Sequence, residues 1–116
     1  MKSKNLLVNI THSPLGSPAG LMEISMVLAL ASAPETHKLR IVFSGDGIYF
    51  ALKDFSPKGW EKILKSLRVL EVEMHVEEES LKKRGLSIND IKENFTVRTG
   101  QELASFPSWA DHALAF

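Results

Sequence analysis

Short apolar runs alternate with longer stretches of helical periodicity along the chain. The apolar runs predict five strands, over 6–10, 39–43, 70–76, 95–98 and 112–116. Between them, apolar residues recur at helical spacing, most clearly over 60–67. Strands separated by helices imply right-handed crossover connections with helices on both faces. The pattern therefore predicts an α/β fold, a three-layer α/β/α sandwich with a mostly parallel five-stranded sheet.

Ser-Pro pairs and alternation predict where individual elements begin. Ser17-Pro18 and Ser56-Pro57 are typical helix starts, because serine caps free N–H groups and proline suits the first helical position. The helix expected over 18–33 is apolar on most sides and should be largely buried. Residues 70–76 alternate apolar and polar, which predicts a strand with one polar face, or one face near a subunit boundary.

Turn and capping residues mark several further ends. Ser44 to Gly47 is expected to form a turn before a short helix over 48–52. Three acids at 77–79 open a helix that ends near Gly85, which suits the helix dipole and the C-terminal cap. Thr99 and Glu102 have the spacing of a capping box at a later helix.

Size and composition limit the classes of function. The 116 residues predict a single domain over 1–116. Lys and Arg number 14, as do Asp and Glu, and this neutral balance argues against a protein that grips nucleic acid by phosphate neutralisation. The absence of cysteine excludes disulfides, thiolate metal sites and covalent chemistry at a cysteine. No long apolar run predicts a membrane span or a signal-peptide core, so a cytoplasmic location is expected.

Candidate polar residues gather where strands are predicted to end. Ligands of open α/β sheets bind beyond the carboxyl ends of the strands. A ligand or partner cleft at that edge would comprise Thr11, His12, Ser13, Ser44, Asp46, His75 and Glu77.

Each part of this cleft also has a simpler structural interpretation. The loop at 11–16 could hold an anion before a helix start, but it lacks the glycine patterns of nucleotide sites, and an ordinary loop is favoured. Asp46 lies between two glycines, which is good turn chemistry. His12 and His75 could share one edge, yet the histidines lack metal-ligand spacing. Residues 77–79 could supply a general base, but a solvated first helical turn is favoured. We therefore predict no catalytic residue, no metal and no cofactor.

Aromatic residues are numerous enough for a core and one interface anchor. Most are expected in the core, and the exposed exception is predicted at Phe106 and Trp109, because Pro107 should end a helix there. These two residues are the candidate interface.

Four segments, in order, resemble the DsrE/DsrF-like family. Residues 13–30 are similar to its first loop and helix, and 41–52 to its second strand with Asp46-Gly47 and an aromatic helix start. Residues 74–86 carry a similar Ser-Leu-x-x-Arg-Gly segment, and 110–116 resemble its closing strand. The branch most similar to the chain is the DsrF/TusC one.

The resemblance implies a five-stranded sandwich that assembles into trimers or hexamers and belongs to a cytoplasmic sulfur relay. Such complexes pass sulfur as cysteine persulfide, toward tRNA thiolation or in dissimilatory sulfur metabolism. The sulfur-carrying cysteine of DsrE-type subunits lies just after the third strand, a place that Glu77 occupies or adjoins in this chain. A carboxylate cannot carry sulfane sulfur, so the scaffold role carries over and the covalent step does not.

Two functions follow as hypotheses. The first is a non-catalytic DsrF/TusC-like subunit that assembles with itself, as a trimer or hexamer, or with cysteine-bearing DsrE/DsrH-like paralogues, without direct contact to nucleic acid or membrane. The alternative is a small-molecule or anion-binding protein that uses Thr11, His12, Ser13, Ser44 and Asp46. Such a cleft could also host non-covalent hydrolytic chemistry, with His12 or Asp46 as the base.

Overall fold

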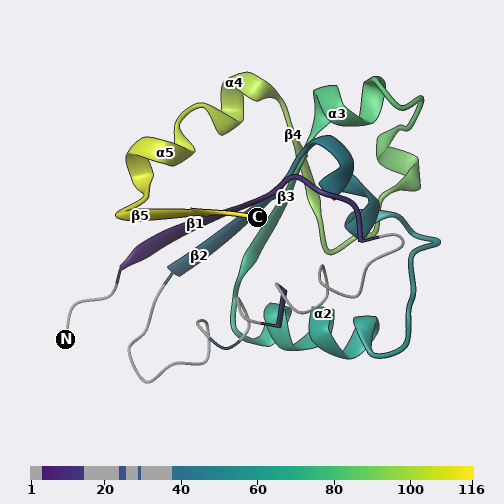
Figure 1. The fold of residues 1–116 in the computed structure, drawn as a ribbon, viewed down its shortest axis with the longest axis horizontal. Coiled ribbons are helices and arrows are strands. Elements are labelled where there is room, and N and C mark those ends of the chain that lie inside the picture. The colour runs from purple at the N-terminus through teal and green to yellow at the C-terminus, as the bar shows by residue number, and fades with distance from the viewer. Residues whose placement is uncertain (1–3, 15–23, 26–28, 30–37) are drawn as a thin grey trace.

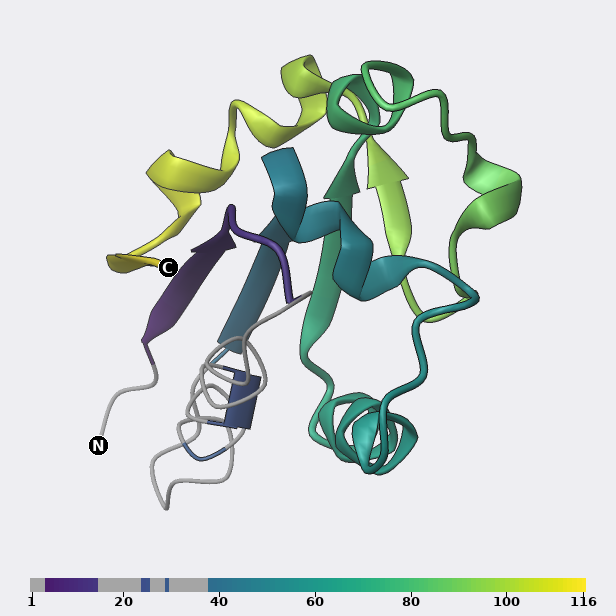
Figure 2. The ribbon, with the colours of Figure 1, turned by 45° about the vertical axis from the view of Figure 1, so that its right-hand side comes forward.

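The computed structural model describes residues 4–14, 24–25, 29 and 38–116. Five strands form one sheet in the order β4-β3-β2-β1-β5, and every neighbouring pair is parallel. The arrows of β1, β3 and β4 point the same way in Figure 2. The strands are β1 (Asn5–Ile10), β2 (Lys38–Phe43), β3 (Glu73–Glu77), β4 (Thr96–Arg98) and β5 (His112–Ala115). The predicted α/β fold with a parallel five-stranded sheet is confirmed.

Helices connect the strands and lie on both sides of the sheet (Figure 1). The α-helices are α2 (Trp60–Val69), α3 (Glu78–Lys82), α4 (Gly100–Leu103) and α5 (Phe106–Trp109). Within the described residues, η1 (Gly45–Ala51) and η2 (Ile88–Asp90) are 3-10 helices. The helix predicted over 18–33 falls mostly outside the described residues, although Ile24 within it is fully buried.

Successive side chains of a strand point to opposite faces of the sheet, so each strand contributes to two separate apolar clusters. On one face, strand residues such as Val8 and Ile41 pack with the fully buried side chains of α2: Trp60, Leu64 and Leu67. On the other face, Leu7 and Val42 form a smaller apolar cluster with Phe106 of α5. The larger core therefore lies on the α2 side.

An aromatic group fills part of the larger core. Phe43, Phe50, Phe55, Phe95 and Trp60 form successive contacts with ring centroids 5.4 to 5.8 Å apart. Such edge and tilted contacts suit the ring quadrupole. The expectation that most aromatic residues belong to the core is correct.

The second Ser-Pro pair does not begin a helix. Helix α2 starts at Trp60, after Gly59 with a left-handed φ of 87°. Glycine adopts this backbone angle without a steric cost, so the chain can turn sharply into the helix there. The prediction of a helix start at Ser56-Pro57 is wrong by a few residues.

The strand predicted from residue 70 begins later, at Glu73. Residues 70–72 instead close α2: the Glu71 N–H donates to the Arg68 carbonyl, and the Val72 N–H donates to the Leu67 carbonyl. These two bonds and the positive φ of Glu71 form a Schellman ending, which satisfies carbonyls that a helix end leaves free. The alternation of apolar and polar residues over 70–76 is the same for this helix ending as for a strand, so the sequence does not show where the strand begins.

Phe106 is not the exposed residue that the sequence predicted. Its side chain is 8% exposed and belongs to the smaller core, and Trp109 is half-buried beside it. Pro107 lies in the first turn of α5, where its missing N–H costs nothing, rather than at a helix end. The interface role of both residues stays a prediction.

Candidate functional site

The carboxyl ends of β1, β2 and β3 meet at one edge of the sheet, because the strands are parallel and adjacent. The chain leaves β1 through Thr11, whose N–H and hydroxyl both donate to the Phe116 carbonyl, at 3.0 and 3.1 Å. It leaves β2 through Ser44, whose N–H donates to the Ile10 carbonyl at 3.0 Å. These bonds tie the ends of β1 and β2 to each other and to the final residue.

The helix η1 lies directly against the end of β1. A Cβ atom on Gly47 would come within 2.1 Å of the Ile10 carbonyl oxygen, so no larger residue fits. Gly45 has a φ of 54°, and its N–H donates to the Ser80 hydroxyl at 2.9 Å. The Ser44–Gly47 segment is therefore the start of a 3-10 helix, where the sequence predicted a turn.

Four side chains at this edge form a group that we name the edge cluster: Asp46, Glu77, Ser80 and Arg84. Arg84 donates to Asp46 Oδ1 from Nη2 at 2.8 Å and from Nε at 3.2 Å, and its Nη1 donates to the Ser80 carbonyl at 3.0 Å. The buried Ser80 hydroxyl donates to the Glu77 carboxylate. The cluster fastens η1 to α3.

The structure brings together part of the predicted cleft. Asp46 and Glu77 share the edge cluster, and Thr11 and Ser44 lie at the neighbouring strand ends. His12 and Ser13 are half-buried in the loop after β1. His75 is separate: it lies inside β3, 3% exposed and in edge-to-face contact with Phe106. The proposal that His75 shares the edge with His12 is therefore wrong, because residue 75 points to the α5 side of the sheet.

A second polar group, the sheet-face cluster, surrounds His75. It consists of Arg40, Glu73, His75, Arg98 and Glu102, from β2, β3, β4 and α4. Glu73 Oε1 lies 3.0 Å from His75 Nε2 and 3.4 Å from Arg40 Nε. Arg98 Nε donates to His75 Nδ1 at 3.4 Å, and its Nη1 donates to Glu102 at 3.3 Å.

The partners of His75 fix its tautomer. Arg98 can only donate, so Nδ1 must accept and the proton of neutral His75 sits on Nε2, from which it donates to Glu73. Burial lowers the pKa of His75, and the bond to Glu73 opposes that shift. His75 is therefore a neutral, fully bonded histidine, and the expected polar face of this strand is partly buried.

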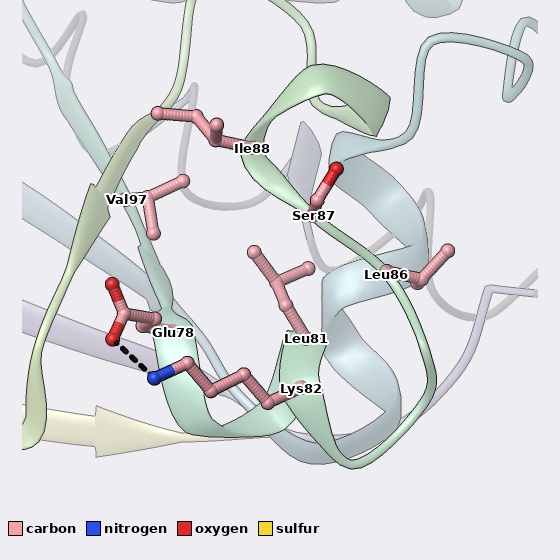
Figure 3. A pocket seen from close by; sticks show the side chains of 7 residues that line it. All are labelled: Glu78, Leu81, Lys82, Leu86, Ser87, Ile88 and Val97. Carbon is pink, nitrogen blue, oxygen red and sulfur yellow. Dashed lines mark ion pairs between the residues drawn. The ribbon is translucent and has the colours of Figure 1, made fainter.

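A groove of about 320 Å³ lies beside α3, away from the predicted cleft (Figure 3). Leu81, Leu86 and Val97 give it apolar walls, and the ion pair of Glu78 and Lys82, at 3.1 Å, lies at its rim. Figure 3 shows these side chains converging from α3, β4 and the segment between them. None of the seven residues of the predicted cleft lines it, whereas Glu78, one of the three acids at 77–79, does.

The predicted site includes Asp46 and Glu77 of the edge cluster but neither Ser80 nor Arg84. Of the sheet-face cluster it includes only His75. Ser80 and Arg84 are four residues apart on one helical face after β3, a spacing that could have found them. Arg40 interrupts an apolar strand, and a charge in a buried parallel strand indicates a partner. Among the described residues, no three His, Asp or Glu side chains gather closely enough to hold a metal ion.

The fold and the edge cluster define a class: a small parallel α/β sandwich whose polar residues collect at the carboxyl ends of β2 and β3. The family model that describes the DsrE/DsrF-like family matches residues 4–116. The chain therefore belongs to the DsrE/DsrF-like family.

Two solved structures have the same fold. The YchN protein of E. coli is 22% identical, with a TM-score of 0.82 over 99% of this chain and 100% of that chain. MTH1491 of Methanobacterium thermoautotrophicum, a protein of unknown function, is 17% identical, with a TM-score of 0.78 over 98% of this chain and 100% of that chain. No curated protein matches the chain. In the described part of the chain, no helix is long and apolar enough to cross a membrane.

Proposed function

We propose that this protein is a non-catalytic, DsrF/TusC-like subunit of a sulfur relay that assembles with itself or with cysteine-bearing DsrE/DsrH-like paralogues. Membership of the DsrE/DsrF-like family supports a role related to sulfur relay at the level of the family. The finer role rests on one observation. Glu77 ends β3, and the resemblance implies that it occupies or adjoins the place, just after the third strand, where DsrE-type subunits carry sulfur on a cysteine. The chain contains no cysteine.

The chemistry of Glu77 supports a scaffold. A persulfide forms on a thiolate, and a carboxylate cannot hold sulfane sulfur. The Glu77 carboxylate also accepts a hydrogen bond from buried Ser80, which accepts one from the Gly45 N–H. Through these hydrogen bonds Glu77 has a structural role, at or next to a position where a DsrE-type subunit would carry a reactive thiol. The subunit would then shape and shield a persulfide that a neighbour carries.

Introducing a thiol at residue 77 tests whether this place faces a sulfur donor. The Glu77→Cys variant should accept sulfane sulfur from a persulfide-loaded, cysteine-bearing DsrE-type subunit faster than Glu93→Cys does. Glu93 is exposed elsewhere on the chain, so its variant controls for simple thiol exchange. Mass spectrometry of each variant after mixing measures the transferred sulfur. Equal rates for the two variants would contradict the assignment of this place.

Anion binding at the carboxyl edge has less support. The N–H groups of Gly45 and Gly47 donate within the chain, to Ser80 and Ser44. Asp46 is paired with Arg84, so its carboxylate is engaged. Groups that already have partners offer a ligand little gain, because each new bond replaces an existing one.

A further inference from the structure

The segment 99–110, which holds α4 and α5, lies over one face of the sheet (Figure 1). Its buried apolar contribution is small: Phe106 packs on Leu7 and Val42, with Leu103 and Trp109 partly buried around them. Helix α2, on the opposite face, places three fully buried side chains in the larger core. The segment depends more on polar contacts than α2 does.

Those polar contacts converge on the sheet-face cluster. The Arg40 guanidinium carbon lies 4.5 Å from the Phe106 ring centroid and 4.0 Å from that of Trp109. The His75 ring meets Phe106 edge-on, with centroids 4.8 Å apart. Arg98 bridges His75 to Glu102 of α4. Cation–π and charge-assisted contacts of this kind add to apolar burial where they are shielded from water.

The charges of the sheet-face cluster balance only while His75 is neutral. Arg40 and Arg98 then face Glu73 and Glu102, and the four charges sum to zero. A proton on Nδ1 would remove the acceptor of the Arg98 N–H and place a third positive charge between two guanidinium groups. Glu73 is about half exposed, so water screens the compensation that it can offer.

We propose that His75 is a pH-sensitive latch: while neutral it holds segment 99–110 on the sheet, and its protonation releases that segment before the rest of the fold. Helix α5 carries no titratable side chain, and Glu77, further along β3, is engaged by Ser80. The Thr99 N–H donates to Glu102 and lowers the pKa of that carboxyl group, so Glu102 stays ionised as the pH falls. Within the sheet-face cluster, His75 is therefore the side chain whose charge changes as the pH falls below neutral.

The sign of the effect follows from linkage. Burial lowers the pKa of His75 in the folded chain below the usual 6.5. The stability that neutral His75 gives to the closed segment 99–110 is therefore complete above about pH 6.5. It is lost as the pH falls from there toward the lowered pKa of the folded state, because the released state binds the proton more tightly.

Hydrogen exchange of the full chain at about pH 7.5 and pH 5 tests the latch, after correction for intrinsic exchange rates. Protection in 99–110 should fall measurably at the lower pH, because burial lowers the pKa of folded His75, while α2 keeps its protection. The His75→Gln variant, whose amide can still donate to Glu73, should lose this pH dependence. His112→Gln, at an exposed histidine of β5, should keep it.

Three results would overturn the latch: equal loss of protection in α2, no loss in 99–110, or an unchanged pH dependence in His75→Gln. If that variant does not fold, an NMR titration of the wild-type chain still tests the proposal. The NMR titration midpoint of the His75 ring should coincide with the midpoint of opening of 99–110. A difference of more than about one pH unit between them would contradict the proposal.

Discussion

Gly47 is the residue whose replacement the backbone tolerates least. A Cβ atom there would meet the Ile10 carbonyl oxygen at 2.1 Å, which forces η1 away from β1. Gly47→Ala should therefore lower the free energy of unfolding by about 3 kcal/mol or more. Gly100→Ala is the matched control, because nothing lies within 4 Å of its added Cβ. Urea unfolding of both variants measures the difference, and equal stabilities would contradict the close approach of η1 to β1.

Glu71 is a position where, in contrast, glycine should be more stable than the residue present. Its φ of 60° lies in the left-handed region, at the position of the Schellman ending that glycine usually occupies. Glu71→Gly should raise the unfolding free energy by about 0.5–1 kcal/mol, because the relief of strain exceeds the added freedom of the unfolded chain.

The matched control for Glu71 is the same substitution inside a helix. Glu79→Gly, in α3, should lower the unfolding free energy by about 1 kcal/mol. Thermal or urea unfolding gives both values. A loss of stability in Glu71→Gly would show that its backbone conformation is not strained.

At the scale of elements, Ser80 joins η1 to α3. Ser80→Ala leaves the Gly45 N–H and the Glu77 carboxylate without their partner and should cost about 1–3 kcal/mol in unfolding free energy. Ser66→Ala in α2 is the control, because that hydroxyl donates to an exposed carbonyl within its own helix and the change should be near neutral. Equal effects in the two variants would show that the edge cluster does not fasten these elements.

Periodicity predicted most elements but not all of their ends. The spacing of apolar residues located α2, and the Thr99 and Glu102 pair is a capping box in the structure. The end of α2 could not be predicted, because Glu71 stands where glycine would have marked the ending. Pro107 begins α5 rather than ending a helix, a difference that sequence does not resolve because proline fits a first turn as well as the residues after a helix.

The clusters were harder to predict than the strands. The position of Asp46 and Glu77 at one edge follows from the parallel order of β1, β2 and β3. Their partners are Ser80 of α3 and Arg84 of the turn after it, and sequence spacing does not show that this part of the chain meets η1. His75 alternates with acids along β3 and was expected on a polar face. The aromatic ring that buries it, Phe106, lies 31 residues further along the chain (106 − 75).

At the scale of the whole molecule, the chain has the fold and the family that its segments indicate, and its proposed role depends on the residue that stands in place of the sulfur-carrying thiol. The chain keeps the parallel sheet of the DsrE/DsrF-like family and places Glu77 at the end of β3. Because the net charge is zero, no long-range electrostatic repulsion opposes the association of two copies, or of this chain with a neutral partner. Assembly with a cysteine-bearing subunit is then the step that would give this chain its role.

Native mass spectrometry tests that role most directly. The chain is measured alone and after mixing with cysteine-bearing DsrE/DsrH-like subunits of the same organism, at micromolar concentration. We predict a defined oligomer, of this chain alone or with such a subunit, in which any sulfane sulfur is carried by the partner. A strictly monomeric chain that binds none of these subunits would contradict the proposed scaffold function.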